Sequence, residues 1–97
     1  MSFTKEKALV NVESYINDIC FIDKSEKRKI DEIIRVIVNE IEGKSINGHI
    51  NYEILIKTFY VSRIEHLKYI NYELYQKGFY SEISENGENY IFNIKLI

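Results

Sequence analysis

The sequence predicts a small α+β domain that is mostly helical and ends in a β-hairpin. Apolar residues recur at helical spacing through the first half of the chain and again after Ser62. Near the C-terminus, Asn86-Gly87 lies between two runs of β-forming residues, which is a strong hairpin signal. The chain has 97 residues, of which 45% are hydrophobic and 29% charged, so it is long enough for one globular domain and too apolar for a disordered chain.

The first predicted helix covers residues 4–20. Its apolar residues form a stripe about 140° wide, as expected for a helix packed on one side, and they are Ala8, Leu9, Val12, Tyr15, Ile16, Ile19 and Cys20. Cys20 is the only cysteine, so no intramolecular disulfide is expected, and a buried thiol in a reducing, cytoplasmic compartment is the simplest interpretation. No signal-peptide pattern or apolar run of about 18 residues occurs, so no membrane partner is expected.

The second predicted helix covers residues 24–42. Asp23 and Glu26 fit a capping box, Ser25 is an alternative N-cap, and Gly43 suits the helix end. Its apolar face is about 200° wide, so it is either the central helix of one protomer or a contact with a second chain. The residues expected in a dimer interface are Ile30, Ile33, Ile34, Ile37 and Ile41.

Residues 44–61 predict a turn, a short strand and a short helix. Asn47-Gly48 tolerates the positive φ angles of a turn, and "HIN" suits a single short strand. Asn51 is a suitable N-cap for a helix over Tyr52–Phe59.

A longer helix is expected to begin at Ser62 and to end at Gly78. Ser62 and Glu65 fit the S-x-x-E capping box. The predicted buried stripe consists of Ile64, Leu67, Ile70 and Leu74.

The last segment, residues 79–97, predicts a hairpin with a type I′ turn at Asn86-Gly87. This turn pairs Glu85 with Glu88 and Ile83 with Tyr90. One face of the hairpin then packs on the helices and holds Phe79, Ile83, Tyr90, Phe92, Ile94 and Leu96.

From about Ile50 onward the chain resembles the winged helix-turn-helix superfamily of DNA-binding domains. The resemblance is carried by "HINYEILIKTFYVSRIEHLKYINYELYQKGFY" and by the wing "SEISENGENYIFNIKLI". The residues in the family's characteristic positions are Asn51, Leu55, Ile56, Phe59, Val61, Ser62, Leu74, Gly78 and Phe79. Two positions depart from it: Tyr60 replaces a frequent glycine, and His66 stands where an aliphatic residue is usual.

The resemblance implies one domain made of residues 1–43 for dimerisation, 44–78 for the helix-turn-helix and 79–97 for the wing. It also implies that the long helix after Ser62 enters the major groove of duplex DNA. Candidate contacts are hydroxyl, cationic and tyrosine side chains that can reach phosphates or base edges. They are Ser62, Arg63, His66, Lys68, Tyr69, Tyr72, Lys44, Lys27 and Arg28.

The charge distribution supports a local contact and no general coating of nucleic acid. The net charge is −2, while residues 44–78 carry five cationic and three acidic side chains. The wing carries Glu82, Glu85 and Glu88 against Lys95 and is therefore a poor phosphate ligand. The run "KSEKRK" at residues 24–29 is either a phosphate contact or an ordinary solvated helix start.

The predicted function is a homodimeric duplex-DNA-binding protein that acts by occupying its site. Two roles fit this, a transcriptional regulator and a centromere-binding partition adaptor that recruits a filament-forming partner. The alternative is a protein-interaction module that uses Tyr69, Tyr72 and Tyr80. Neither an enzyme nor a bound cofactor or metal is expected, because His49, His66 and Cys20 are scattered and no phosphate loop or zinc spacing occurs.

Overall fold

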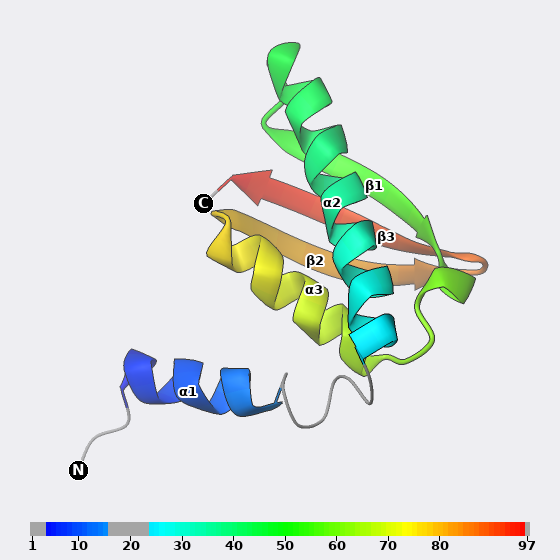
Figure 1. Cartoon of the computed structure of the whole chain (residues 1–97). Helices are drawn as coiled ribbons and strands as arrows, with labels where there is room; N and C mark the ends of the chain where they lie inside the picture. The colour runs from blue at the N-terminus through cyan, green and yellow to red at the C-terminus, as the bar shows by residue number, and fades with distance from the viewer. Residues whose placement is uncertain (1–3, 16–23, 97) are drawn as a thin grey trace.

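The computed structural model describes residues 4–15 and 24–96 and confirms the α+β class. The elements, in chain order, are helices α1 (Lys5–Tyr15) and α2 (Lys24–Ile46), strand β1 (Asn51–Lys57), the 3₁₀ turn η2 (Thr58–Tyr60), helix α3 (Glu65–Gln76), and strands β2 (Phe79–Asn86) and β3 (Asn89–Leu96) (Figure 1). In the described part of the chain, no helix combines the length and the apolar character needed to cross a membrane.

The three strands form one antiparallel sheet in the order β1-β3-β2. Helices α2 and α3 both lie on one face of this sheet, as Figure 1 shows. Along β1, buried and exposed residues alternate without a break. This alternation is typical of a sheet with one covered and one solvated face.

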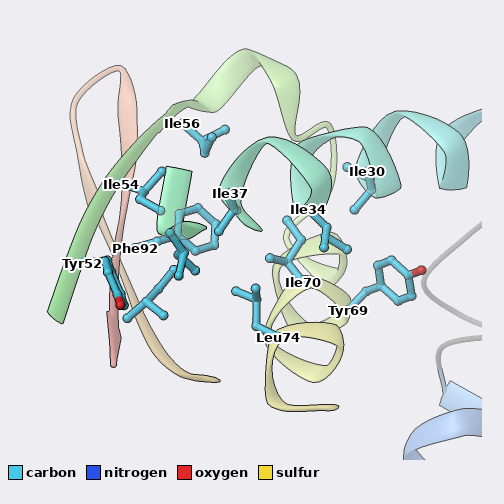
Figure 2. Packing of buried hydrophobic residues seen from close by; sticks show 12 residues of the cluster. Ile30, Ile34, Ile37, Tyr52, Ile54, Ile56, Tyr69, Ile70, Leu74 and Phe92 are labelled. Atoms are coloured by element: carbon cyan, nitrogen blue, oxygen red, sulfur yellow. The ribbon is translucent and has the colours of Figure 1, made fainter. Parts of the chain in front are cut away.

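The core lies between the two helices and the inner face of the sheet. Figure 2 shows Ile34 and Ile37 of α2 directed toward Ile70 of α3 and Phe92 of β3. Ile37, Ile70 and Phe92 are each 0% exposed. Because α2 and α3 pack both on the sheet and on each other, the core fixes which face of each helix remains available.

Strand β1 replaces the helix expected over Tyr52–Phe59, so that prediction is wrong. The segment satisfies two periodicities, and the period-two one prevails because Tyr52, Ile54 and Ile56 all reach the core while the whole strand pairs with β3. Tyr and Ile also favour strands. The helix period also requires Leu55 to face the core, but Leu55 is 58% exposed on the open face of the sheet.

Helix α2 continues past Gly43 and ends at Ile46, four residues beyond the predicted end at Glu42. At its C-terminus the Gly48 N–H donates to Ser45 O over 2.9 Å, and the His49 N–H donates to Lys44 O over 3.3 Å. This pair of bonds is a Schellman motif, in which the residue equivalent to Gly48 is left-handed. Gly48 has φ +86°, as Asn47-Gly48 predicted.

Helix α3 begins at Glu65, so the predicted capping box of Ser62 and Glu65 does not form. The residue before the helix is Ile64, which makes no side-chain capping bond. The first turn instead closes through short-range bonds, from the His66 N–H to Arg63 O at 3.1 Å and from the Leu67 N–H to Ile64 O. The predicted end of the helix at Gly78, which has φ +94°, is confirmed.

The hairpin of β2 and β3 is present, but its register differs from the prediction by two residues. Glu85 pairs with Tyr90 and Asn86 pairs with Asn89, so Gly87-Glu88 forms the turn. Gly87 has φ +60° and no non-glycine residue described has positive φ, which is the pattern of a type II′ turn and excludes type I′. A shift of two residues preserves the faces, so Phe92 and Ile94 are buried as predicted. Leu96, which was expected on the same covered face, is 52% exposed at the end of β3, so that part of the prediction is wrong.

The hairpin is held against β1 over its whole length and does not project as a free wing. β1 pairs with β3 from Asn51↔Lys95 to Lys57↔Asn89. At the turn, the Thr58 N–H donates to Glu88 O over 2.7 Å. The tip of the hairpin is therefore tied to the start of η2.

The first predicted helix is described only in part. Helix α1 covers Lys5–Tyr15 and has no buried residue. The predictions for Ile16, Ile19 and Cys20 and the proposed cap at Asp23 lie outside the described residues.

Two glycines, one inside α2 and one just after it, allow a pair of substitutions with opposite expected effects on stability. Gly43→Ala is expected to stabilise the protein by about 1 kcal/mol, because alanine is the better helix former in a helix interior. A Cβ at Gly43 meets no heavy atom within 4 Å. Gly48→Ala is expected to destabilise it by about 1 kcal/mol, because an L-residue disfavours positive φ. Urea unfolding followed by circular dichroism, at one protein concentration, measures both. Equal effects of the two substitutions would contradict the observed helix end.

Candidate functional site

The N-terminal ends of α2 and α3 meet at one end of the molecule (Figure 1). His66 Nε2 of α3 lies 3.1 Å from Glu26 Oε1 in the first turn of α2. The Tyr69 hydroxyl donates to Asp31 Oδ1 over 2.5 Å. These two contacts join the N-terminal halves of the two helices.

Cationic and hydroxyl side chains gather around these two helix starts. We call this surface the basic end, and it consists of Lys24, Lys27, Arg28, Ser62 and Arg63. All of them are exposed except Arg63, which is partly exposed and has Nε 3.6 Å from Glu65 Oε2.

Two neighbouring carboxylates of α2 have partners on α3. Glu26 faces His66, and Asp31 accepts from Tyr69. The N-terminus of a helix also carries a partial positive charge and exposed backbone N–H donors. The basic end therefore combines cationic side chains with two helix starts, an arrangement suited to anionic groups such as phosphates.

His66 and Tyr69 are not surface residues, so their predicted contact with DNA is wrong. His66 is 0% exposed and Tyr69 is 4% exposed. The buried side of α3 runs through His66, Tyr69, Ile70 and Leu74, so it keeps the last two residues of the predicted stripe and adds His66 and Tyr69. Ile64, the first residue of the predicted buried stripe, is 69% exposed instead.

Burial also changes the acidity of Tyr69. Loss of solvent around the phenol and its hydrogen bond to the Asp31 carboxylate both raise the pKa of Tyr69. The phenol therefore stays protonated and donates to Asp31 throughout the neutral range. Tyr69 acts as a tie between α2 and α3.

Lys68 and Tyr72 lie on the outer side of α3, where α1 packs across them. Lys68 Nζ lies 5.0 Å from the centre of the Tyr15 ring, which is a cation–π contact. The Tyr72 hydroxyl donates to Glu13 Oε1 over 3.3 Å. Partial burial and the Glu13 carboxylate raise the pKa of Tyr72. This part of the predicted DNA surface thus contacts α1, while Lys68 itself remains exposed.

Lys44 does not join the basic end. It lies in the last turn of α2, about 26 Å along the helix axis from Lys27 at 1.5 Å per residue. Its Nζ donates to Glu53 O over 3.2 Å. Lys44 therefore fixes the end of α2 to the start of β1.

The predicted dimer interface on α2 is wrong for most of its residues. Ile30, Ile34, Ile37 and Ile41 are at most 5% exposed within a single protomer, where they form the core. They are covered by α3 and the sheet and are not available to a second chain. Ile33 is only half-buried and lies on a different side of the helix.

That side of α2 borders a groove that the sequence did not predict. The groove lies between α2 and the end of β1 with η2 and has a volume of about 780 Å³. Its apolar lining residues are Ile33, Val36, Ile56, Phe59 and Tyr60, and we call this set the apolar groove.

The aromatic wall of the apolar groove is open to solvent. Phe59 is 71% exposed and Tyr60 is 57% exposed, with their ring centres 4.2 Å apart. The sequence signals were the unusually wide apolar face of α2 and the Phe59-Tyr60 pair, which was assigned to a helix and a turn.

No group of histidine, cysteine or carboxylate side chains suited to a metal ion occurs among residues 4–15 and 24–96. A scan against protein-family models gave no match. Searches of curated proteins and of solved structures gave no match either.

The raised pKa of Tyr69 predicts a loss of stability at alkaline pH. A phenol whose folded pKa exceeds its unfolded value of about 10 stabilises the protein fully below that value. This contribution is lost as the pH rises further, by up to about 1.4 kcal/mol per pH unit. Tyr69→Phe is expected to cost about 1 kcal/mol at pH 7, through the lost hydrogen bond.

Chemical unfolding of both proteins between pH 7 and pH 11 measures the difference. The gap between wild type and Tyr69→Phe is expected to shrink above pH 10. The matched control is Tyr75→Phe, because Tyr75 lies on the same helix and is 48% exposed. A gap that stays constant with pH would show that Tyr69 is not buried against Asp31.

Proposed function

We propose that this chain binds duplex DNA through the basic end and that it acts by occupying its binding site. The observation that carries the proposal is the convergence of cationic side chains from α2 and from the segment before α3 around two helix starts. The contacts of Glu26 with His66 and of Asp31 with Tyr69 keep nearby carboxylates engaged within the fold. The order helix, strand, helix, hairpin supports the resemblance to winged helix-turn-helix domains. The turn η2 stands where the first helix of the helix-turn-helix unit itself is expected, between β1 and α3.

The chemistry of the basic end favours phosphate contacts over base reading. Lysine and arginine side chains and helix N-termini are the usual phosphate ligands. Arg28 and Arg63 are the two side chains of the set that offer a planar fork for guanine. With His66 and Tyr69 in the core, the surface has few groups left to discriminate bases. Occupancy of this kind suits a transcriptional regulator and a centromere-binding partition adaptor alike.

A second candidate function, protein binding, is favoured by the apolar groove. Exposed aromatic residues beside arginine are typical of protein interfaces, and Phe59 and Tyr60 border the groove together with Arg28. The groove is adjacent to the basic end, since Arg28 belongs to both. The two candidate functions therefore do not exclude each other.

The DNA proposal predicts a salt-dependent affinity that depends on the basic end. Each phosphate contact that is lost lowers the slope of log affinity against log salt by about 1. The double variant Lys27→Ala with Arg63→Ala is expected to weaken binding and to lower this slope by about 2. Fluorescence anisotropy with a labelled pool of random-sequence duplexes, at several salt concentrations, measures both quantities.

Lys44→Ala is the control, because it removes one positive charge at the far end of α2. It is expected to leave both affinity and slope unchanged. Absence of salt-sensitive binding at low ionic strength would refute the proposal. An equal loss in Lys44→Ala would place the contact elsewhere.

A further inference from the structure

The outer side of α2 carries a stripe that passes along the apolar groove. Its residues are Lys29, Ile33, Val36 and Glu40, spaced by four, three and four positions. This spacing keeps all of them on one side of a helix. Lys29 and Glu40 are exposed, Val36 is 43% exposed and Ile33 is half-buried. The stripe thus has an apolar centre with a positive residue at one end and a negative residue at the other.

We propose that a second copy of this chain occupies the apolar groove, with the two α2 helices packed antiparallel about a twofold axis. An antiparallel pair centred between Ile33 and Val36 places Ile33 opposite the partner's Val36. The same register places Lys29 opposite the partner's Glu40, and the twofold axis repeats this ion pair. One stripe therefore meets an identical stripe with matching charges, as a twofold interface requires.

The order of charges along the stripe favours a second copy of the chain in the antiparallel orientation. In a parallel arrangement in register, Lys29 would meet Lys29 and Glu40 would meet Glu40, which is repulsive. The antiparallel arrangement turns both meetings into attractions. The stripe is also uninterrupted, because α2 runs over 23 residues from Lys24 to Ile46.

The aromatic wall supplies the area that two helices alone lack. A specific interface usually buries about 1,200–2,000 Å² in total, and one helix stripe provides only a part of it. Phe59 and Tyr60 stand beside Ile33 and Val36 in the groove and have most of their surface in solvent. Covering these rings by the partner's α2 removes the largest apolar side chains of this face from water.

This proposal goes beyond the proposed DNA binding and does not depend on it. Lys27 and Arg63 of the basic end are not part of the stripe and lie outside the proposed interface. A protein that dimerises without binding DNA, or binds DNA as a monomer, would separate the two proposals.

Charge reversal tests the register directly. Sedimentation equilibrium of the full chain is expected to show a monomer–dimer equilibrium for the wild type. Lys29→Glu and Glu40→Lys, each alone, are expected to raise the dissociation constant about tenfold or more, because each places like charges opposite each other. The double variant K29E/E40K restores both attractions and is expected to return the constant to within about threefold of the wild-type value.

Val36→Glu places a charge at the centre of the stripe and is expected to give a monomer. Its exposure within the protomer allows the fold to persist, which circular dichroism verifies. Leu55→Glu is the matched control, since Leu55 is 58% exposed on the open face of the sheet, and it is expected to leave the dimer intact.

Three results would overturn the proposal. They are a wild type that stays monomeric over the whole accessible concentration range, a dimer that Val36→Glu leaves unchanged, and a double charge reversal that fails to restore association.

Discussion

The packing of two helices on a single face of a three-stranded sheet determines what the rest of this molecule can do. Ile37 of α2, Ile70 of α3 and Phe92 of β3 meet with no exposed surface (Figure 2). Interiors packed this closely tolerate little rotation of a helix about its axis. Once these three contacts form, every other side chain of α2 and α3 has a fixed direction. The available surfaces are therefore consequences of the core.

Two polar contacts refine this arrangement at the end where the helices begin. Burying an imidazole and a phenol is costly unless each finds a polar partner. His66 lies beside Glu26, and Tyr69 donates to Asp31, so both partners come from α2. The same contacts give two carboxylates of α2 partners on α3. Lys27 and Arg28 lie beside these carboxylates on the exposed surface of α2.

The sequence predicted the helical core residues and the faces of the hairpin well, because both follow from clear periodicity. Ile70 and Leu74 are buried as expected, and so are Phe92 and Ile94. It failed at β1, where "NYEILIK" satisfies the helix period and the strand period together. Only pairing with β3, a contact about 40 residues away in sequence, decides between them.

The candidate site was harder to predict than the core, and the reason is geometric. Moving the start of a helix does not alter its composition, yet a different choice of buried stripe exchanges core and surface residues. Here Ile64 became exposed while His66 and Tyr69 became buried. The hydrogen-bonding capacity of these two residues suggested DNA contacts, whereas the fold uses it to join α2 to α3. Ser62 and Arg63 precede the helix, and both retain exposed surface.

The same constraint separates the two surfaces to which we assign functions. The core takes up the side of α2 that carries Ile30, Ile34, Ile37 and Ile41, which leaves a second apolar side without cover in one protomer. An antiparallel pairing through Ile33 and Val36 would place the two basic ends on opposite sides of a twofold axis. Twofold DNA-binding proteins recognise half-sites related by the same symmetry. The position of the axis along α2 would then set the distance between the two basic ends. The register of the helix pair would therefore determine the spacing of the half-sites that the dimer can bind.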